Sequence, residues 1–181
     1  MLRISGGQFA GRSLVLPSSA TTRPVTEKNR AAIFNSLFSH VLDAKVLDLY
    51  AGSGALSFEA LSRGAATAIM VEKSNKVAAM IRDNIERLGV GERSTVEVAD
   101  VDGWLTKAQA ETRYDLIFFD PPYVRFDAQL AEKASTLLQS GGILVVSMSS
   151  RGKLPDEVGE AKLLKSKVYG DSQFGFFQKL Q

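Results

Sequence analysis

Short apolar runs alternate with helix-length segments along most of this 181-residue chain. The runs have the length of strands and lie at residues 45–50, 65–72, 94–100, 114–120 and 143–150. Strands that are buried on both faces and joined by helices form parallel sheets with right-handed crossovers. The alternation therefore predicts an α/β fold of the Rossmann-like class, built on a doubly wound, mostly parallel sheet.

The two ends of the chain predict antiparallel hairpins. Residues 161–180 contain two strand-like runs around a Gly-Asp turn, which gives a sheet of seven strands. Residues 2–17 predict a short hairpin broken by glycines, with Gly11 near its turn. The chain is accordingly divided into an N-terminal β-hairpin and basic arm, residues 1–25, and a main domain, residues 26–181.

Two of the predicted helices have clear boundaries. The first covers residues 27–42, where Thr26 can cap the start and apolar residues recur at helical spacing. These apolar residues are Ile33, Phe34, Leu37, Phe38 and Val41. The last covers residues 128–142, where a pair of glycines ends it.

The composition excludes several classes of protein. Cysteine is absent, so disulfides, thiolate metal sites, iron–sulfur clusters and cysteine nucleophiles are impossible. No apolar run reaches the roughly 18 to 20 residues of a membrane span, and the N-terminus lacks the core of a signal peptide. The single histidine, His40, has no partner for a metal site. We expect a cytoplasmic protein without membrane or metal partners.

Basic side chains are concentrated at the N-terminus. Residues 1–30 carry five basic side chains and one acidic one, whereas residues 31–150 carry eleven basic and fifteen acidic ones. A basic arm on a slightly acidic body suits a segment that meets phosphates, and solubilising charge on a chain end is the alternative explanation. The candidates for phosphate contacts in a nucleic acid are Arg3, Arg12 and Lys28.

An acidic residue stands at the end of each of the first four predicted strands of the sheet. These residues are Asp48, Glu72, Asp100 and Asp120. Ligands of doubly wound sheets bind beyond the carboxyl ends of the strands, where these side chains would meet. The pattern predicts a polar ligand site at that edge of the sheet.

A glycine turn follows the first of these strands. Gly52 and Gly54 let the backbone approach a ligand closely, and the helix that begins behind them favours an anionic group. The dinucleotide fingerprint requires a third glycine at the position of Ser57. The turn alone is therefore a weak indicator, and an ordinary strand-to-helix turn is the alternative.

Glu72 lies 20 residues after Gly52, at the end of the next strand. In dinucleotide folds a carboxylate at this place accepts hydrogen bonds from ribose hydroxyls. Together with the glycine turn it predicts a nucleoside site, in which Asp100 would accept a bond from an adenine amino group. Taken alone, Glu72 could equally be a surface acid beside Lys73.

The most specific signal is the tetrad Asp120-Pro121-Pro122-Tyr123 at the end of the fourth strand. The nitrogen of an aromatic amine is weakly nucleophilic, because its lone pair is delocalised into the ring. A carboxylate and a rigidly presented backbone carbonyl can accept its two N–H bonds and align the lone pair with a methyl group on a sulfonium. The tyrosine offers a flat face on which a splayed base can stack. The tetrad predicts methylation of an amino group on a base, and a simple proline turn is the alternative.

In their order along the chain, the glycine turn, the acids and the tetrad resemble class I S-adenosylmethionine methyltransferases that act on amino groups. The segments RISGGQFAGRSL and RPVTEKNRAAIFNSL resemble the RsmD family of bacterial 16S ribosomal RNA guanine-N2 methyltransferases. This resemblance implies methyl transfer from S-adenosylmethionine to the exocyclic N2 of a guanine in 16S ribosomal RNA, of the guanine-966 type. The implied partner is ribosomal RNA or the assembling small ribosomal subunit.

The resemblance also implies roles for individual residues. The loop that performs catalysis would consist of Asp120, Pro121, Pro122 and Tyr123. The residues that bind the cofactor would be Asp48, Gly52, Gly54, Glu72 and Asp100. Three more residues would lie over the active site and help to hold cofactor or RNA: Arg23, Thr26 and Arg30.

This chain departs from the family pattern in two places. Several relatives have phenylalanine at the position of Tyr123, a change that keeps the stacking face. The segment 147–155 lacks the acid expected near Ser147, which leaves the role of that position open.

Three other functions remain open. An adenine-N6 methyltransferase acting on DNA or RNA could use the same tetrad, although this chain has no room for the insert with which DNA enzymes read the groove. A nicotinamide-dependent oxidoreductase would require the third glycine and leaves the tetrad unexplained. A non-catalytic RNA-binding module would require a disrupted Asp120 or Glu72, and both are intact. A C5-pyrimidine methyltransferase is excluded, because that chemistry needs a cysteine nucleophile.

Overall fold

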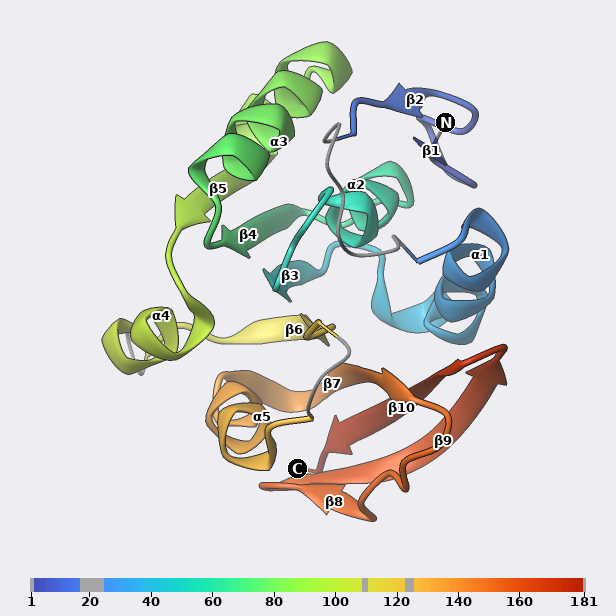
Figure 1. Cartoon of the computed structure of the whole chain (residues 1–181), viewed down its shortest axis with the longest axis vertical. Coiled ribbons are helices and arrows are strands. Elements are labelled where there is room, and N and C mark those ends of the chain that lie inside the picture. The colour runs from blue at the N-terminus through green and yellow to red at the C-terminus, as the bar shows by residue number, and fades with distance from the viewer. Residues whose placement is uncertain (1, 17–24, 109–110, 123–125, 181) are drawn as a thin grey trace.

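An eight-stranded mixed sheet forms the centre of the molecule (Figure 1). The computed structural model describes residues 2–16, 25–108, 111–122 and 126–180. The strands follow the spatial order β5-β4-β3-β6-β7-β10-β9-β8. The parallel strands are β3 (Lys45–Leu49), β4 (Thr67–Glu72), β5 (Ser94–Val98), β6 (Tyr114–Phe119) and β7 (Leu138–Ser149). The antiparallel strands at one edge are β8 (Glu157–Val158), β9 (Ala161–Tyr169) and β10 (Ser172–Lys179).

Helices cover both faces of the sheet, and each layer encloses a hydrophobic core. The helices of one face are α1 (Glu27–Ser36), α2 (Ala55–Ser62) and α3 (Asn75–Leu88). Those of the other face are α4 (Val101–Lys107) and α5 (Ala128–Ser135) (Figure 1). None of the helices in the described part of the chain is long and apolar enough to cross a membrane. The predicted doubly wound sheet and its C-terminal antiparallel hairpin are confirmed, with the short strand β8 added at the edge.

The direction of strand addition reverses between β3 and β6. From the central strand β3 the chain proceeds to β4 and β5 on one side, then crosses to β6 and β7 on the other. Asp48 on β3 lies opposite Met70 of β4 and Phe118 of β6 in the parallel ladders. Doubly wound sheets bind their ligands at such a reversal, beyond the carboxyl ends of the strands. The predicted site acids follow these same strands.

The first helix ends earlier than the sequence predicted. α1 stops at Ser36, and the N–H of Leu37 donates to the carbonyls of Ile33 and Phe34. The chain then continues as the 3₁₀ turn η1 (Phe38–His40) instead of further α-helical turns. Because this turn no longer follows the helical spacing, Phe38 leaves the apolar face and is 86% exposed.

The last predicted helix is also shorter than expected, because the sheet takes over its final residues. α5 ends at Ser135, and β7 begins at Leu138, which pairs with Tyr114 on β6. The glycine pair therefore lies within an irregular part of this ladder and ends no helix. Gly141 has a φ of 79° there, a conformation that glycine adopts without strain.

The predicted N-terminal hairpin consists of β1 (Leu2–Arg3) and β2 (Ser13–Leu14). Its apolar side chains belong to the core that α1, α2 and α3 also enclose. The N–H of Phe9 in the hairpin loop donates to Ser62 Oγ at the end of α2, at 2.9 Å. The hairpin thus packs on the main domain and shares its core.

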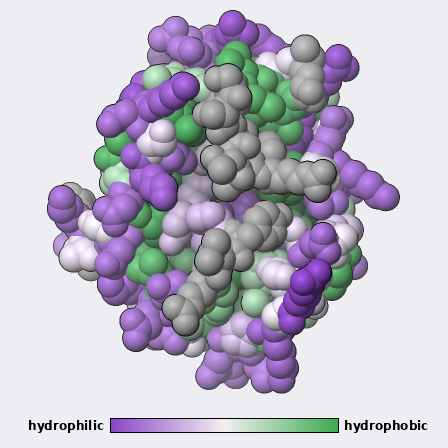
Figure 2. All heavy atoms as spheres, viewed as in Figure 1, coloured by the Kyte–Doolittle hydropathy of each residue, from purple (hydrophilic) through white to green (hydrophobic). Residues whose placement is uncertain are grey.

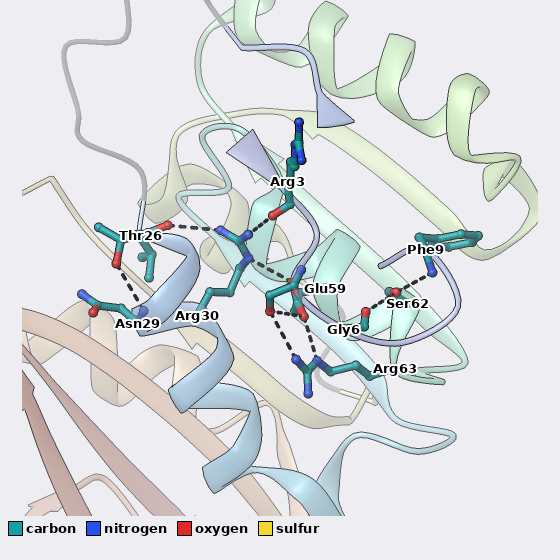
Figure 3. A network of polar contacts seen from close by, with 11 residues as sticks. Arg3, Gly6, Phe9, Thr26, Asn29, Arg30, Glu59, Ser62 and Arg63 are labelled. Carbon is teal, nitrogen blue, oxygen red and sulfur yellow. Dashed lines mark hydrogen bonds and ion pairs between the residues drawn. The ribbon is translucent and has the colours of Figure 1, made fainter. Parts of the chain in front are cut away.

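A buried ion-pair network joins the hairpin, α1 and α2 (Figure 3). The carboxylate of Glu59, which is fully buried, accepts from Nε of Arg30 at 3.0 Å and from Nε of Arg63 at 2.8 Å. It also accepts from the N–H and hydroxyl of Ser5, at 2.8 and 2.7 Å. Burial disfavours the charge, but the bonds from Ser5, Arg63 and Arg30 hold the pKa of Glu59 below its usual value. Charged groups are stable in a core when they are paired in this way.

Candidate active site

The glycine turn between β3 and α2 has one packed side and one open side. Gly52 and Gly54 have φ angles of 54° and 72°, in the left-handed region. A Cβ on Gly54 would lie 2.8 Å from the ring of Phe58, so packing requires glycine at this position. A Cβ on Gly52 would meet no atom nearer than 3.8 Å. The open side at Gly52 is where a ligand can approach the backbone.

Asp48 lies on β3, just before this turn, and is only 1% exposed. Its carboxylate accepts hydrogen bonds from the hydroxyl of Ser57, at 2.8 Å, and from the Ser57 backbone N–H in the first turn of α2. Burial raises the pKa of Asp48 to about 7, the charges of Asp120 and Glu72 add to this, and the Ser57 bonds oppose it. Asp48 can therefore influence a ligand at this turn only indirectly, through its charge and through the shape of the turn.

Glu72 at the end of β4 is joined directly to the glycine turn. One carboxylate oxygen accepts from the N–H of Gly52 at 3.0 Å, and the other accepts from the N–H of Ser74 at 2.8 Å. The side chain is partly exposed. Each carboxylate oxygen can accept a further bond. Glu72 can therefore hold the turn and accept hydroxyl hydrogens from a ligand at the same time.

Asp100 is the N-cap of α4, and β5 ends before it at Val98. Its Oδ1 accepts from the N–H of Gly103 at 2.9 Å. The residue is exposed, so its second carboxylate oxygen can accept from a ligand. The strand is shorter than predicted because Asp100 satisfies a free backbone donor of the helix start instead of extending the ladder.

Asp120 follows β6 at the strand reversal and is partly exposed. Burial raises the pKa of Asp120, and a hydrogen bond with the side chain of Ser147 on β7 lowers it. Its charge acts on Asp48, so the acids that end β3 and β6 lie within electrostatic range of one another. Pro121 and Pro122 follow it, the first partly exposed and the second exposed. Tyr123 lies outside the described residues.

Tyr50 is a residue of this edge to which the sequence analysis gave no role. It has a φ of 66°, an uncommon conformation for a residue with a side chain. Its ring meets that of Phe119 edge-on with 5.3 Å between centroids, and Phe119 meets Phe126 at 6.4 Å. Phe119 and Phe126 stand on either side of the tetrad in the sequence, so these rings link the glycine turn to both flanks of the tetrad. Tyrosine is common in protein cores, so a tyrosine after a strand does not by itself indicate a role in a functional site.

The three residues expected above the active site have different environments. Oγ1 of Thr26 accepts from the N–H of Asn29 at 3.2 Å, so Thr26 caps α1 as predicted. Arg30 is fully buried, and its guanidinium bonds Glu59 and two backbone carbonyls. This side chain can influence a ligand by positioning α1, and no part of it is free to touch one. Arg23 lies outside the described residues.

The direction of α1 determines where its basic residues lie. Arg30 on α1 pairs with Glu59 on α2, and one turn further along each helix the Arg63 guanidinium lies 5.4 Å from the ring centroid of Phe34. The two helices therefore run in the same direction. Since α2 begins at the carboxyl edge of the sheet, α1 begins toward that edge as well. Lys28, in the first turn of α1, is exposed on this side.

Arg12 and Arg3 are the other two residues predicted to contact RNA phosphates. Nη2 of Arg12 donates to the carbonyl of Arg87 at 2.6 Å, at the end of α3, where the chain returns toward the amino ends of the strands. Arg3 is exposed on β1. Figure 2 shows hydrophilic side chains around most of the rim of the face drawn, with hydrophobic ones mainly inside it. Of these basic residues, Arg12 therefore lies away from the edge that holds the acids.

Comparisons with known proteins agree over almost the whole chain. Residues 2–178 match the model of the family described as conserved hypothetical protein 95. Ribosomal RNA small subunit methyltransferase D of Escherichia coli strain K12 is 34% identical, with 98% of this chain and 90% of that protein covered. The putative rRNA methyltransferase YlbH of Bacillus subtilis strain 168 is 31% identical, with 98% and 99% covered. A solved structure described as putative methyltransferase yhhF from Escherichia coli superposes with a TM-score of 0.88 at 32% identity, covering 99% of this chain and 98% of that one.

Proposed function

Because the chain belongs to the RsmD family of S-adenosylmethionine-dependent methyltransferases, we propose that it methylates the exocyclic N2 of a guanine in small-subunit ribosomal RNA. The match to relatives named as rRNA methyltransferases, over nearly their whole lengths, supports this substrate. The observation that carries the proposal is the location of Asp120 and its two prolines at the strand reversal, in electrostatic contact with the acid beneath the glycine turn.

The residues around the glycine turn fit S-adenosylmethionine. Gly52 leaves open space beside the backbone, and Glu72 can still accept bonds from two ribose hydroxyls. Asp100 keeps one carboxylate oxygen for the amino group of an adenine. When bound, the cofactor supplies a methyl group that a sulfonium makes electrophilic. When ionised, the carboxylate of Asp48 has the sign that stabilises a cationic ligand at this edge.

In the proposed reaction Asp120 holds and orients the guanine amino group. Its carboxylate accepts one N–H bond, and a backbone carbonyl of the proline segment accepts the other, so that the nitrogen lone pair points in one direction. Positive charge develops on nitrogen as the new bond forms. A carboxylate that is already in place stabilises this charge more strongly in the transition state than in the ground state.

We expect Asp120→Ala to slow methyl transfer by about 10²–10³-fold while cofactor affinity stays unchanged, as for loss of one preorganised electrostatic partner. Asp120→Asn should be milder, because its amide oxygen still accepts a bond. Single-turnover transfer to small-subunit particles that lack the modification measures both rates, with Asp83→Asn on the exposed surface of α3 as a matched control.

Mass spectrometry of the digested RNA identifies the product. An Asp120→Ala enzyme with the wild-type rate would remove this residue from the mechanism. A product of N6-methyladenosine in place of N2-methylguanosine would show that the substrate is adenine, the second base whose amino group the tetrad can hold.

A further inference from the structure

A serine hydroxyl lies beside each of two acids at the carboxyl edge, the buried Asp48 and the partly exposed Asp120. Ser57, which is fully buried, donates to Asp48 at 2.8 Å. Ser147, which is 5% exposed, bonds the carboxylate of Asp120. Both serines stand where a known pattern has another residue: the dinucleotide fingerprint has a third glycine at position 57, and the family pattern has an acid near position 147. The same two departures therefore supply hydroxyl donors to two carboxylates.

The sheet register explains why Ser147 reaches Asp120. Phe119 of β6 pairs with Val146 of β7 in a parallel ladder, so the next residue of each strand is a neighbour at the carboxyl edge. On its other side Ser147 pairs with Phe174 of β10, whose side chain is buried. Across the ladder of β6 and β7 Ser147 lies beside Asp120, and its hydroxyl lowers the pKa of that carboxyl.

We propose that Ser147 is a positioning residue for methyl transfer, whose hydroxyl holds the Asp120 carboxylate in its ionised, amine-accepting form. This inference rests on the proposed function, in which Asp120 accepts an N–H bond from the substrate amine. A protonated carboxyl presents an O–H in place of one acceptor, so it holds an amino group less well.

The surroundings of Asp120 explain what this donor contributes. Burial favours the neutral form of Asp120. Asp48 on β3, another acid, lies within electrostatic range of it. A hydroxyl that donates to the carboxylate favours the ionised form without adding a charge. An acid at position 147 would instead add another carboxylate beside Asp120.

The test compares four enzymes: wild type, Ser147→Ala, Ser147→Thr and Ser149→Ala. Ser149 is the matched control, since it lies on the same strand and its hydroxyl accepts from the N–H of Arg151 instead of contacting an acid. The first readout is the pH titration of the Asp120 carboxyl carbon by ¹³C NMR in cofactor-free protein, with the resonance assigned by its loss in Asp120→Asn. The second is the pH profile of single-turnover methyl transfer.

We expect Ser147→Ala to move the Asp120 titration and the acid limb of the rate profile to higher pH together. The rate at neutral pH should fall about fivefold, the effect of losing a hydrogen bond of ordinary strength. Ser147→Thr, which keeps the hydroxyl, should titrate and react like wild type, and so should Ser149→Ala. Cofactor affinity should be equal in all four enzymes.

A Ser147→Ala enzyme whose Asp120 titration and rate profile match the wild type overturns the inference. So does a uniform loss of rate at every pH with an unchanged titration, because that result indicates a packing defect alone. Failure of the proposed function looks different. If Asp120→Ala transfers methyl at the wild-type rate, Asp120 is not the amine acceptor, whatever the Ser147 variants do.

Discussion

Asp48 is a residue whose ionisation state ties the site to the stability of the whole fold. Its pKa is 3.8 in an exposed setting and about 7 here, mainly because of burial. Between these pH values the folded protein holds a proton that the unfolded chain has lost, so this group makes stability fall as pH rises. Below the lower value and above the upper one, its contribution is independent of pH.

We therefore expect Asp48→Asn to gain stability relative to wild type as the pH is raised from 5 to 8. The asparagine has nearly the same shape and carries no charge at any of these pH values. The full difference across the titration is on the order of 4 kcal/mol as an upper value, since one pKa unit corresponds to about 1.4 kcal/mol. Urea unfolding at several pH values measures it, with the exposed Asp83→Asn as control. Parallel curves for wild type and Asp48→Asn would contradict the assignment.

At the scale of elements, the network around Glu59 joins three segments that lie far apart in the sequence. Arg30 comes from α1, Ser5 from the hairpin and Arg63 from the end of α2 (Figure 3). Because α2 starts at the glycine turn, this network also fixes the helix on which the turn depends. Every residue of α2 is buried, so a single acid in this helix requires partners.

We expect Arg30→Met to cost about 3 kcal/mol in the free energy of unfolding, because it leaves Glu59 buried with fewer donors. The loss should be smaller in the double variant Arg30→Met/Glu59→Leu, in which the uncompensated charge is also removed. Urea denaturation of both variants and of the single variant Glu59→Leu completes the comparison. A double variant less stable than the sum of the two single losses would speak against a paired charge.

The elements differ in how well the sequence predicted them. The strand runs and the glycine that ends α3 are local signals, so their prediction succeeded. The ends of α1 and α5 depend on competition with turns and with the β6 ladder, which no local pattern contains. The same limit applies to the site. Acids at strand ends could be predicted from topology, whereas the burial of Arg30 and the partners of Ser57 and Ser147 depend on contacts between distant segments.

A clue to the buried charges was nevertheless present in the sequence. The segment ALSFEALS of α2 is apolar except for Glu59 and two serines, and such a helix is buried on all sides. A buried carboxylate in such a helix requires a cationic partner. The sequence predicts that Glu59 has a cationic partner, but nothing in it distinguishes Arg30 from the other arginines near the N-terminus.

At the scale of the whole molecule, the distribution of basic side chains predicts which of them meet RNA. Lys28 is exposed near the carboxyl edge, where α1 begins, whereas Arg12 lies at the end of α3, toward the other edge of the sheet. The two residues therefore form a matched pair of equal charge at different places. If the substrate reaches the acids at the carboxyl edge, its phosphates pass Lys28 before Arg12.

We expect Lys28→Gln to weaken RNA binding and to lower the slope of log affinity against log salt by about 0.7 to 0.9, the value for one phosphate contact. Arg12→Gln should leave that slope nearly unchanged, because the neutralised side chain lies away from the path of the RNA. Filter binding or anisotropy with a small-subunit RNA fragment, from 50 to 200 mM salt, measures both slopes. Equal slopes in the two variants, at the wild-type value, would mean that the arm is solvated surface. A reduced slope in Arg12→Gln alone would place the RNA across the hairpin and α3, away from the acids.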